Sequence, residues 1–182
     1  MPEISLNILD VAQNSVTAGA SLTEIGVVID NAADRLEVTV RDNGRGMLPE
    51  QVENVVDPFY TTRSTRKVGL GVPFLKMAAE MTGGRFSIES KPDQGTMVKA
   101  VFGLTHIDRM PLGDLAATMV TMIASNPDID FVMDYSVDGR NFTVDTREIR
   151  EILDGVPLSE PEILNYITEH VNANVDDLGT RY

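Results

Sequence analysis

The first part of the chain begins with the apolar spacing of a helix and continues with the residue composition of strands. Residues 4–18 carry apolar side chains at intervals of three and four, which predicts a helix. Residues 22–30 and 36–41 are rich in isoleucine and valine, which is typical of strands. The polar segment 31–35 between them has the composition of a short loop. The sequence therefore predicts a helix followed by a β-hairpin.

The next part of the chain predicts two more helices and a second pair of strands. A short helix is expected over 49–56, and a longer one over 72–82 is ended by two glycines. Strands are expected over 85–90 and 96–102, on either side of the turn 91–95. Helices packed on a largely antiparallel sheet make an α+β sandwich, which is the fold class that we expect for residues 1–103.

Residues 104–182 show a pattern of their own, and we expect them to form a second, smaller unit. A helix is predicted over 111–125, and strands over 129–137 and 140–144 are joined by an Asp-Gly dipeptide that suits a two-residue turn. Two further helices are predicted from pairs with capping-box spacing, which are Asp145 with Glu148 and Ser159 with Glu162. The expected order is α-β-β-α-α.

Composition excludes several classes of protein. The chain has no cysteine and only two histidines, His106 and His170, which argues against disulfide frameworks and against zinc or thiolate sites. Its net charge of -13 divides into -3 for residues 1–103 and -10 for residues 104–182. An acidic surface repels phosphate backbones and anionic lipids, so we expect no nucleic-acid or membrane partner. With no long apolar run and no leader-like start, we expect a cytoplasmic protein.

Asp10 and Asn14 are candidates for chemistry on the first helix. They lie four residues apart and so share a helix face, where a carboxylate and an amide oxygen can meet Mg²⁺ and its water. Taken alone, the pair fits an exposed polar helix face better than a metal site.

The turn that follows the second strand has the residues to hold a nucleotide base. Asp42 can accept a hydrogen bond from an exocyclic amine such as that of adenine. Gly44 and Gly46 allow the backbone to approach the base, and Met47 can pack on the ring. Asp-Asn-Gly is also one of the commonest turn sequences, so this segment has a purely structural alternative.

The segment 61–71 has the composition of a phosphate-binding loop. Arg63, Arg66 and Lys67 can neutralise phosphate charge, and the Gly69-Leu70-Gly71 sequence leads into a helix start, where backbone N–H groups bind anions. The spacing is not that of a P-loop, and a basic surface loop is the alternative.

Together, in this order, these segments resemble the ATP-binding domain of the GHKL superfamily, which gyrase, heat-shock chaperones, histidine kinases and MutL share. The runs DPFYTTRSTRKVGLGVPFLKMAAEMTGGRFSIES and QGTMVKAVF are most similar to the catalytic domain of sensor histidine kinases. The resemblance covers residues 4–103. It implies a Bergerat-type two-layer sandwich and ATP with Mg²⁺ as the cofactors.

The resemblance also assigns roles to individual residues. Asn14 matches the magnesium ligand, Asp42 the adenine-binding carboxylate, and Thr96 the threonine that supports it. The other expected contacts with the nucleotide are Ala18, Gly44, Gly46, Met47, Phe59, Thr61, Thr62, Arg63, Arg66, Lys67, Gly69, Leu70, Gly71 and Val72.

Asp10 departs from the family pattern, because the family has a glutamate where this chain has an aspartate. We expect Asp10 to be the catalytic base, with a side chain one methylene shorter. Three functions remain open: phosphoryl transfer to a partner protein in signal transduction, such as a response regulator or another phosphoacceptor; an ATP-operated switch or slow ATPase; or a nucleotide-sensing module that regulates a complex. Residues 104–182 are expected to serve docking or homodimerisation.

Overall fold

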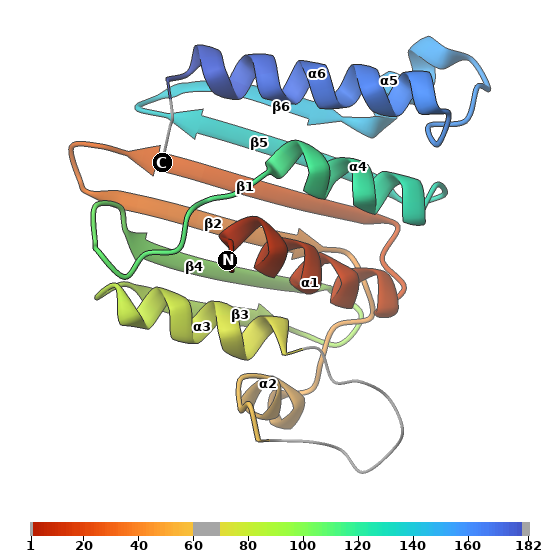
Figure 1. Cartoon of the computed structure of the whole chain (residues 1–182). Coiled ribbons are helices and arrows are strands. Elements are labelled where there is room, and N and C mark those ends of the chain that lie inside the picture. The colour runs from red at the N-terminus through yellow and green to blue at the C-terminus, as the bar shows by residue number, and fades with distance from the viewer. Residues whose placement is uncertain (1, 60–69, 180–182) are drawn as a thin grey trace.

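The computed structural model describes residues 2–59 and 70–179, which form one mixed sheet with helices packed on it (Figure 1). The elements in chain order are α1 (Ile4–Thr17), β1 (Leu22–Asp30), β2 (Arg35–Asp42), α2 (Pro49–Val55), α3 (Gly71–Met81), β3 (Arg85–Ser90), β4 (Thr96–Gly103), α4 (Leu115–Ser125), β5 (Asp130–Val137), β6 (Arg140–Asp145), α5 (Thr146–Leu153) and α6 (Pro161–Asp177). The predicted α+β sandwich is confirmed.

The strands follow the order β3-β4-β2-β1-β5-β6 across the sheet. The pair β1–β5 is parallel and the other four pairs are antiparallel. In β1 and β2 buried and partly exposed residues alternate, so each strand turns one face to the helices. This register places Asp42, at the end of β2, directly opposite Thr96, at the start of β4.

Helices α1, α3, α4 and α6 cover the same face of the sheet (Figure 1). The periodicity of α1 explains its place at the centre, because Ile4, Ile8, Val11 and Ser15 recur at three and four residues and are all buried. The core continues from α3 to α6 between the helices and the sheet. Within residues 2–59 and 70–179, no helix is long and apolar enough to cross a membrane.

Two details of the predicted helices are wrong. The helix expected over 111–125 begins at Leu115, because Pro111 and Leu112 use their carbonyl groups to accept hydrogen bonds from Ile4 and Ser5 at the start of α1. Asp114 caps this helix by accepting from the N–H of Ala117 at 2.8 Å.

The expected caps of the last two helices had different outcomes. Asp145 is the N-cap of α5 and accepts from the N–H of Arg147. At α6 the N-cap position belongs to Glu160 and has no side-chain cap bond, so the expected cap at Ser159 is wrong. Pro161 lies in the first turn, as its fixed φ angle favours.

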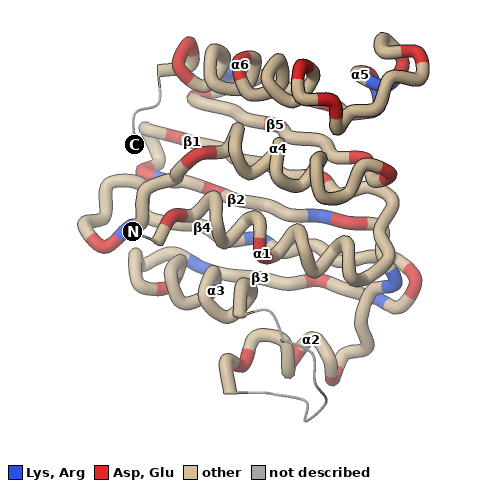
Figure 2. Tube along the Cα trace, turned by 45° about the vertical axis from the view of Figure 1, so that its right-hand side comes forward, with Lys and Arg blue, Asp and Glu red and all other residues tan. Residues whose placement is uncertain are grey.

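The C-terminal segment has the expected order of elements but is joined closely to the rest. Strand β5 pairs with β1, and α4 contacts α1, so the boundary expected at residue 103 lies inside a continuous sheet and core. Acidic residues are frequent along α6 and the loops near it (Figure 2). Whether this segment serves interactions stays a prediction.

Candidate nucleotide-binding site

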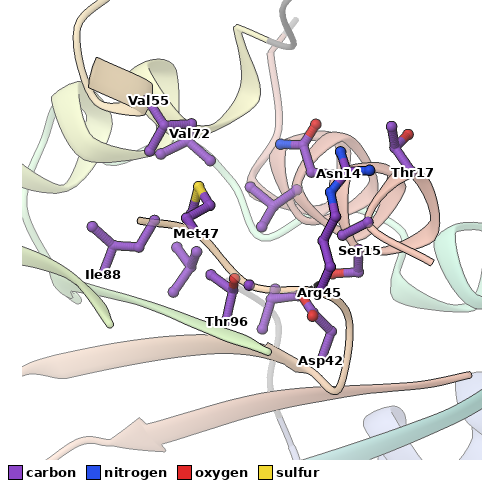
Figure 3. A pocket seen from close by; sticks show the side chains of 15 residues that line it. Asn14, Ser15, Thr17, Asp42, Arg45, Met47, Val55, Val72, Ile88 and Thr96 are labelled. Carbon is purple, nitrogen blue, oxygen red and sulfur yellow. Dashed lines mark hydrogen bonds between the residues drawn. The ribbon is translucent and has the colours of Figure 1, made fainter. Parts of the chain in front are cut away.

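A hollow of about 250 Å³ lies at one end of the helical layer, where α1 ends and α3 begins, next to the end of β2 and the start of β4 (Figure 3). Its walls are largely apolar, and its polar groups come from α1, from the end of β2, from the turn that follows and from the start of β4. The residues that line it are Val11, Asn14, Ser15, Thr17, Ala18, Val40, Asp42, Arg45, Gly46, Met47, Val55, Val72, Ile88, Thr96 and Val98. Apolar walls with a few convergent polar groups are typical of a small-molecule site.

Asp42 is the buried acceptor of this hollow, with 9% of its surface exposed. Its Oδ1 accepts from the N–H of Gly44 and its Oδ2 from the hydroxyl of Ser15, both at 2.8 Å. A carboxylate oxygen can accept two hydrogen bonds, so each retains a lone pair for a further donor. The arrangement suits recognition of a ligand N–H group.

The turn after β2 approaches the neighbouring backbone so closely that glycine is required at two places. Gly46 has φ of +65°, and a Cβ there would lie 1.9 Å from the carbonyl oxygen of Lys91. Gly95 has φ of +80°, and its Cβ would lie 1.9 Å from the carbonyl oxygen of Asp42. These contacts fix the Asp42 backbone against the β3–β4 turn.

Hydrogen bonds from side chains hold the same turn in place. The side-chain oxygen of Asn43 accepts from the N–H groups of Ser21 and Leu22 at 2.9 and 3.1 Å. The hydroxyl of Ser90 accepts from the N–H of Met47 and lies 2.8 Å from the hydroxyl of Thr96. The turn after Asp42 is thus tied to the start of β1 and to the β3–β4 hairpin.

The C-terminal half of α1 forms one wall of the hollow. Ala18 and Asn14 both line it and are half-buried, whereas Asp10, one turn earlier, is exposed and lies outside it. The start of α3 packs against Asp10: a Cβ on Gly71 would lie 2.6 Å from the Cβ of Asp10. Among the described residues there is no cluster of three or more histidine, cysteine or acidic side chains able to hold a metal ion.

The predicted site residues fall into three groups. Those that the structure brings together around the hollow are Asn14, Ala18, Asp42, Gly46, Met47, Val72 and Thr96. Those placed outside it are Asp10, Gly44, Phe59, Leu70 and Gly71, of which Phe59 is 89% exposed. Outside the described residues are Thr61, Thr62, Arg63, Arg66, Lys67 and Gly69.

Sequence reasoning did not identify several residues of the hollow. Its polar members missed in this way are Ser15, Thr17 and Arg45, and its apolar ones are Val11, Val40, Val55, Ile88 and Val98. Strand alternation offered a signal for two of them, because Val40 and Val98 lie two residues from Asp42 and Thr96 and so share their sheet face.

Residues 3–106 match the family model described as histidine kinase-, DNA gyrase B-, and HSP90-like ATPase. The chain belongs to this family. An NtrY-like protein of Rickettsia prowazekii (strain Madrid E), named as a sensor histidine kinase, is 29% identical over 105 residues, which cover 58% of this chain and 17% of that protein. The cell-division control histidine kinase PdhS of Brucella abortus (strain S19) is 30% identical over 122 residues, which cover 58% of this chain and 11% of PdhS.

The chain therefore spans less than a fifth of these curated relatives. Among solved structures, the N-terminal domain of a DNA repair protein matches with a TM-score of 0.52 and 14% identity, over 79% of this chain and 52% of that one. This likeness concerns the fold alone. It extends beyond the residues matched by the family model and so includes part of the C-terminal segment.

The resemblance to GHKL ATPases is thus confirmed, and residues 3–106 are an ATP-binding domain of the histidine-kinase-like type. The residues present fit an adenine nucleotide. Asp42 offers lone pairs for the adenine amine, and apolar side chains such as Met47 and Val98 line the hollow with surfaces suited to a flat ring. At about 250 Å³ the hollow lies below the roughly 300–1,000 Å³ of sites for whole drug-sized ligands, and it suits the base.

Proposed function

We propose that this protein binds Mg²⁺-ATP and transfers the γ-phosphoryl group to a partner protein in signal transduction. The observation that carries the nucleotide part is the buried Asp42 carboxylate, held by Ser15 and Gly44 with lone pairs to spare at the base of an apolar hollow. The likeness of residues 3–106 to proteins named as histidine kinases supports the transfer step.

The direction of α1 supports an assignment of residues along the nucleotide. Ala18, Asn14 and Asp10 follow one another at four-residue steps along one helix face, and each step advances about 6 Å. Ala18 and Asn14 line the hollow, and Asp10 lies beyond its edge. We assign Ala18 to the adenine, Asn14 to the magnesium ion and Asp10 to the γ-phosphate end. There Asp10 acts as the general base that takes the proton from the phosphoacceptor group.

Titration of ATP into wild-type protein and into an Asp42→Asn variant tests the nucleotide part. The amide has the same shape but loses one acceptor oxygen and its charge, so ATP affinity should fall about 10- to 100-fold. Asp128→Asn, at an exposed position in the loop between α4 and β5 that does not line the hollow, is the matched control and should leave affinity unchanged. Equal ATP affinity in all three proteins would refute the assignment of Asp42.

Incubation with γ-labelled ATP and Mg²⁺ tests the chemical step. We expect phosphate release or protein labelling in the wild type and neither in Asp10→Ala, although the variant still binds ATP. Turnover that survives Asp10→Ala would remove Asp10 from the mechanism. Tight ATP binding with no release and no labelling of candidate acceptors would contradict the kinase proposal.

An ATP-operated switch is the second candidate, and the packing of α1 favours it. This helix contacts α3 on one side and α4 on the other. Its first turn is bonded to the C-terminal segment, since Ile4 donates to Pro111 and the Thr118 hydroxyl to Ser5. A shift of α1 on nucleotide binding would therefore reach residues 104–179, where we propose that a partner docks. ATP-dependent hydrogen exchange in α4 is the expected result, and unchanged exchange there would exclude this route.

A further inference from the structure

Arg45 is a charged residue of the hollow that the roles assigned above leave unused. Within residues 2–59 and 70–179 it is the one cationic side chain that lines the hollow. In the same ranges no carboxylate lies within ion-pair distance of it, although Arg35, Arg41, Arg140, Arg147 and Arg150 are each paired. An unpaired guanidinium at a ligand site is a ready partner for an anion.

The backbone of Arg45 is held on both sides. Its N–H donates to the carbonyl oxygen of Ala18 at 3.0 Å, and its carbonyl oxygen accepts from the N–H of Asp93 at 2.7 Å. The side chain leaves this fixed point and runs toward α1, where Asn14 lies (Figure 3). The guanidinium therefore reaches the part of the hollow assigned to the magnesium ion.

The charges of the hollow are separated along its length. Asp42 is the buried acceptor at its base, whereas Arg45 is exposed and belongs to its rim, on the side of Asn14. A complementary ligand carries an N–H donor at one end and negative charge at the other. An adenosine phosphate has this pattern, and the first negative group beyond the ribose is the phosphate bonded to it.

We propose that Arg45 binds the phosphate next to the ribose and so makes the site select nucleotides over nucleosides. This inference rests on the proposed function, because it needs adenine on Asp42. The arginine fork suits two phosphate oxygens at once, whereas an ammonium group acts only as a point charge. Lysine at this position should therefore restore part of the affinity.

Binding of adenosine, AMP, ADP and ATP to the wild type and to Arg45→Gln tests the proposal. We expect the variant to lose roughly tenfold in affinity for all three nucleotides and nothing for adenosine. Arg45→Lys should lie between the two proteins. Arg41→Gln is the matched control, since Arg41 is an exposed arginine four residues earlier that is paired with Glu24 at 3.9 Å and lies outside the hollow.

The outcomes separate this inference from the proposed function. If the wild type binds none of the four ligands, the proposed function fails, and this inference falls with it. If the wild type binds them and Arg45→Gln matches it, only the role of Arg45 is refuted. A loss confined to ADP and ATP would overturn the placement beside the first phosphate, and an equal loss for adenosine would show that Arg45 supports the base pocket instead.

Discussion

Removing one or the other of two buried hydroxyl groups beside Asp42 should change the free energy of unfolding in opposite directions. Ser15 and Thr23 are 3% and 0% exposed. The Ser15 hydroxyl donates to the Asp42 carboxylate at 2.8 Å, whereas the Thr23 hydroxyl, opposite Asp42 in the β1–β2 register, has no hydrogen-bond partner among the described residues. Ser15→Ala removes a satisfied bond, and Thr23→Val replaces an unsatisfied hydroxyl with a methyl group of similar size.

The magnitudes follow from these contacts. A hydrogen bond to a charged group contributes about 1.5–3 kcal/mol, and alanine regains a few tenths through its helix propensity, so Ser15→Ala should lower the free energy of unfolding by about 1–2.5 kcal/mol. An unpaired buried hydroxyl costs about 1–3 kcal/mol, and valine suits a strand at least as well as threonine. Thr23→Val should therefore raise the free energy of unfolding, by about 1 kcal/mol.

Urea unfolding at equilibrium measures both changes, provided that the three proteins share one m-value. ATP titration adds a second readout, because Ser15→Ala also releases Asp42 and should weaken ATP binding, whereas Thr23→Val leaves its bonds intact. A Thr23→Val variant that is less stable than the wild type by 1 kcal/mol or more would show that the Thr23 hydroxyl is satisfied, and would refute the reasoning.

Three further predictions concern the turns, the loss of stability at low pH and the C-terminal segment. Thermal unfolding should show that Gly95→Ala lowers the free energy of unfolding by more than about 2 kcal/mol and Gly139→Ala by only about 1 kcal/mol. Both glycines have positive φ, but only at Gly95 would the added Cβ collide with backbone atoms. The hydrogen bond from the Arg147 side chain lowers the pKa of Asp145 in the folded protein. The stability that the ionised Asp145 adds is therefore present above about pH 4 and is lost as the pH falls through this lowered pKa. Arg147→Gln should therefore reduce the loss of stability in acid, as urea unfolding at several pH values will show. A fragment of residues 1–106 should give the circular dichroism of an unfolded chain, because β1 loses its pairing with β5 and α1 its contacts with α4.

Elements governed by local sequence were predicted closely. The bounds 22–30 and 85–90 agree with β1 and β3 to the residue, since side-chain composition and flanking turns define both ends. The start of α4 was misplaced because the apolar Leu112 continues the helical pattern, yet its carbonyl group is engaged by Ser5 on α1. Such long-range bonds leave no periodic trace in a sequence.

The candidate site was predictable where one short segment carries both the chemistry and the geometry. Asp42, Gly46 and Met47 lie on a single turn, and each lines the hollow. Asp10 shares a helix face with Asn14, but the start of α3 packs against it outside the hollow, and its catalytic role stays a prediction. Helical spacing identifies a shared face and cannot show where the neighbouring helix begins.

The boundary expected at residue 103, from the pattern of elements that follows it, coincides with a change in net charge. The charge is -3 before it and -10 after it, but charged side chains lie mostly on the surface. The faces that join the two segments are instead apolar: Phe131 and Met133 on β5 are buried beside β1, and Met119 on α4 is fully buried in the shared core. Surface charge reports on what a segment presents to water and not on what it packs against. An acidic C-terminal segment is therefore compatible with a single core.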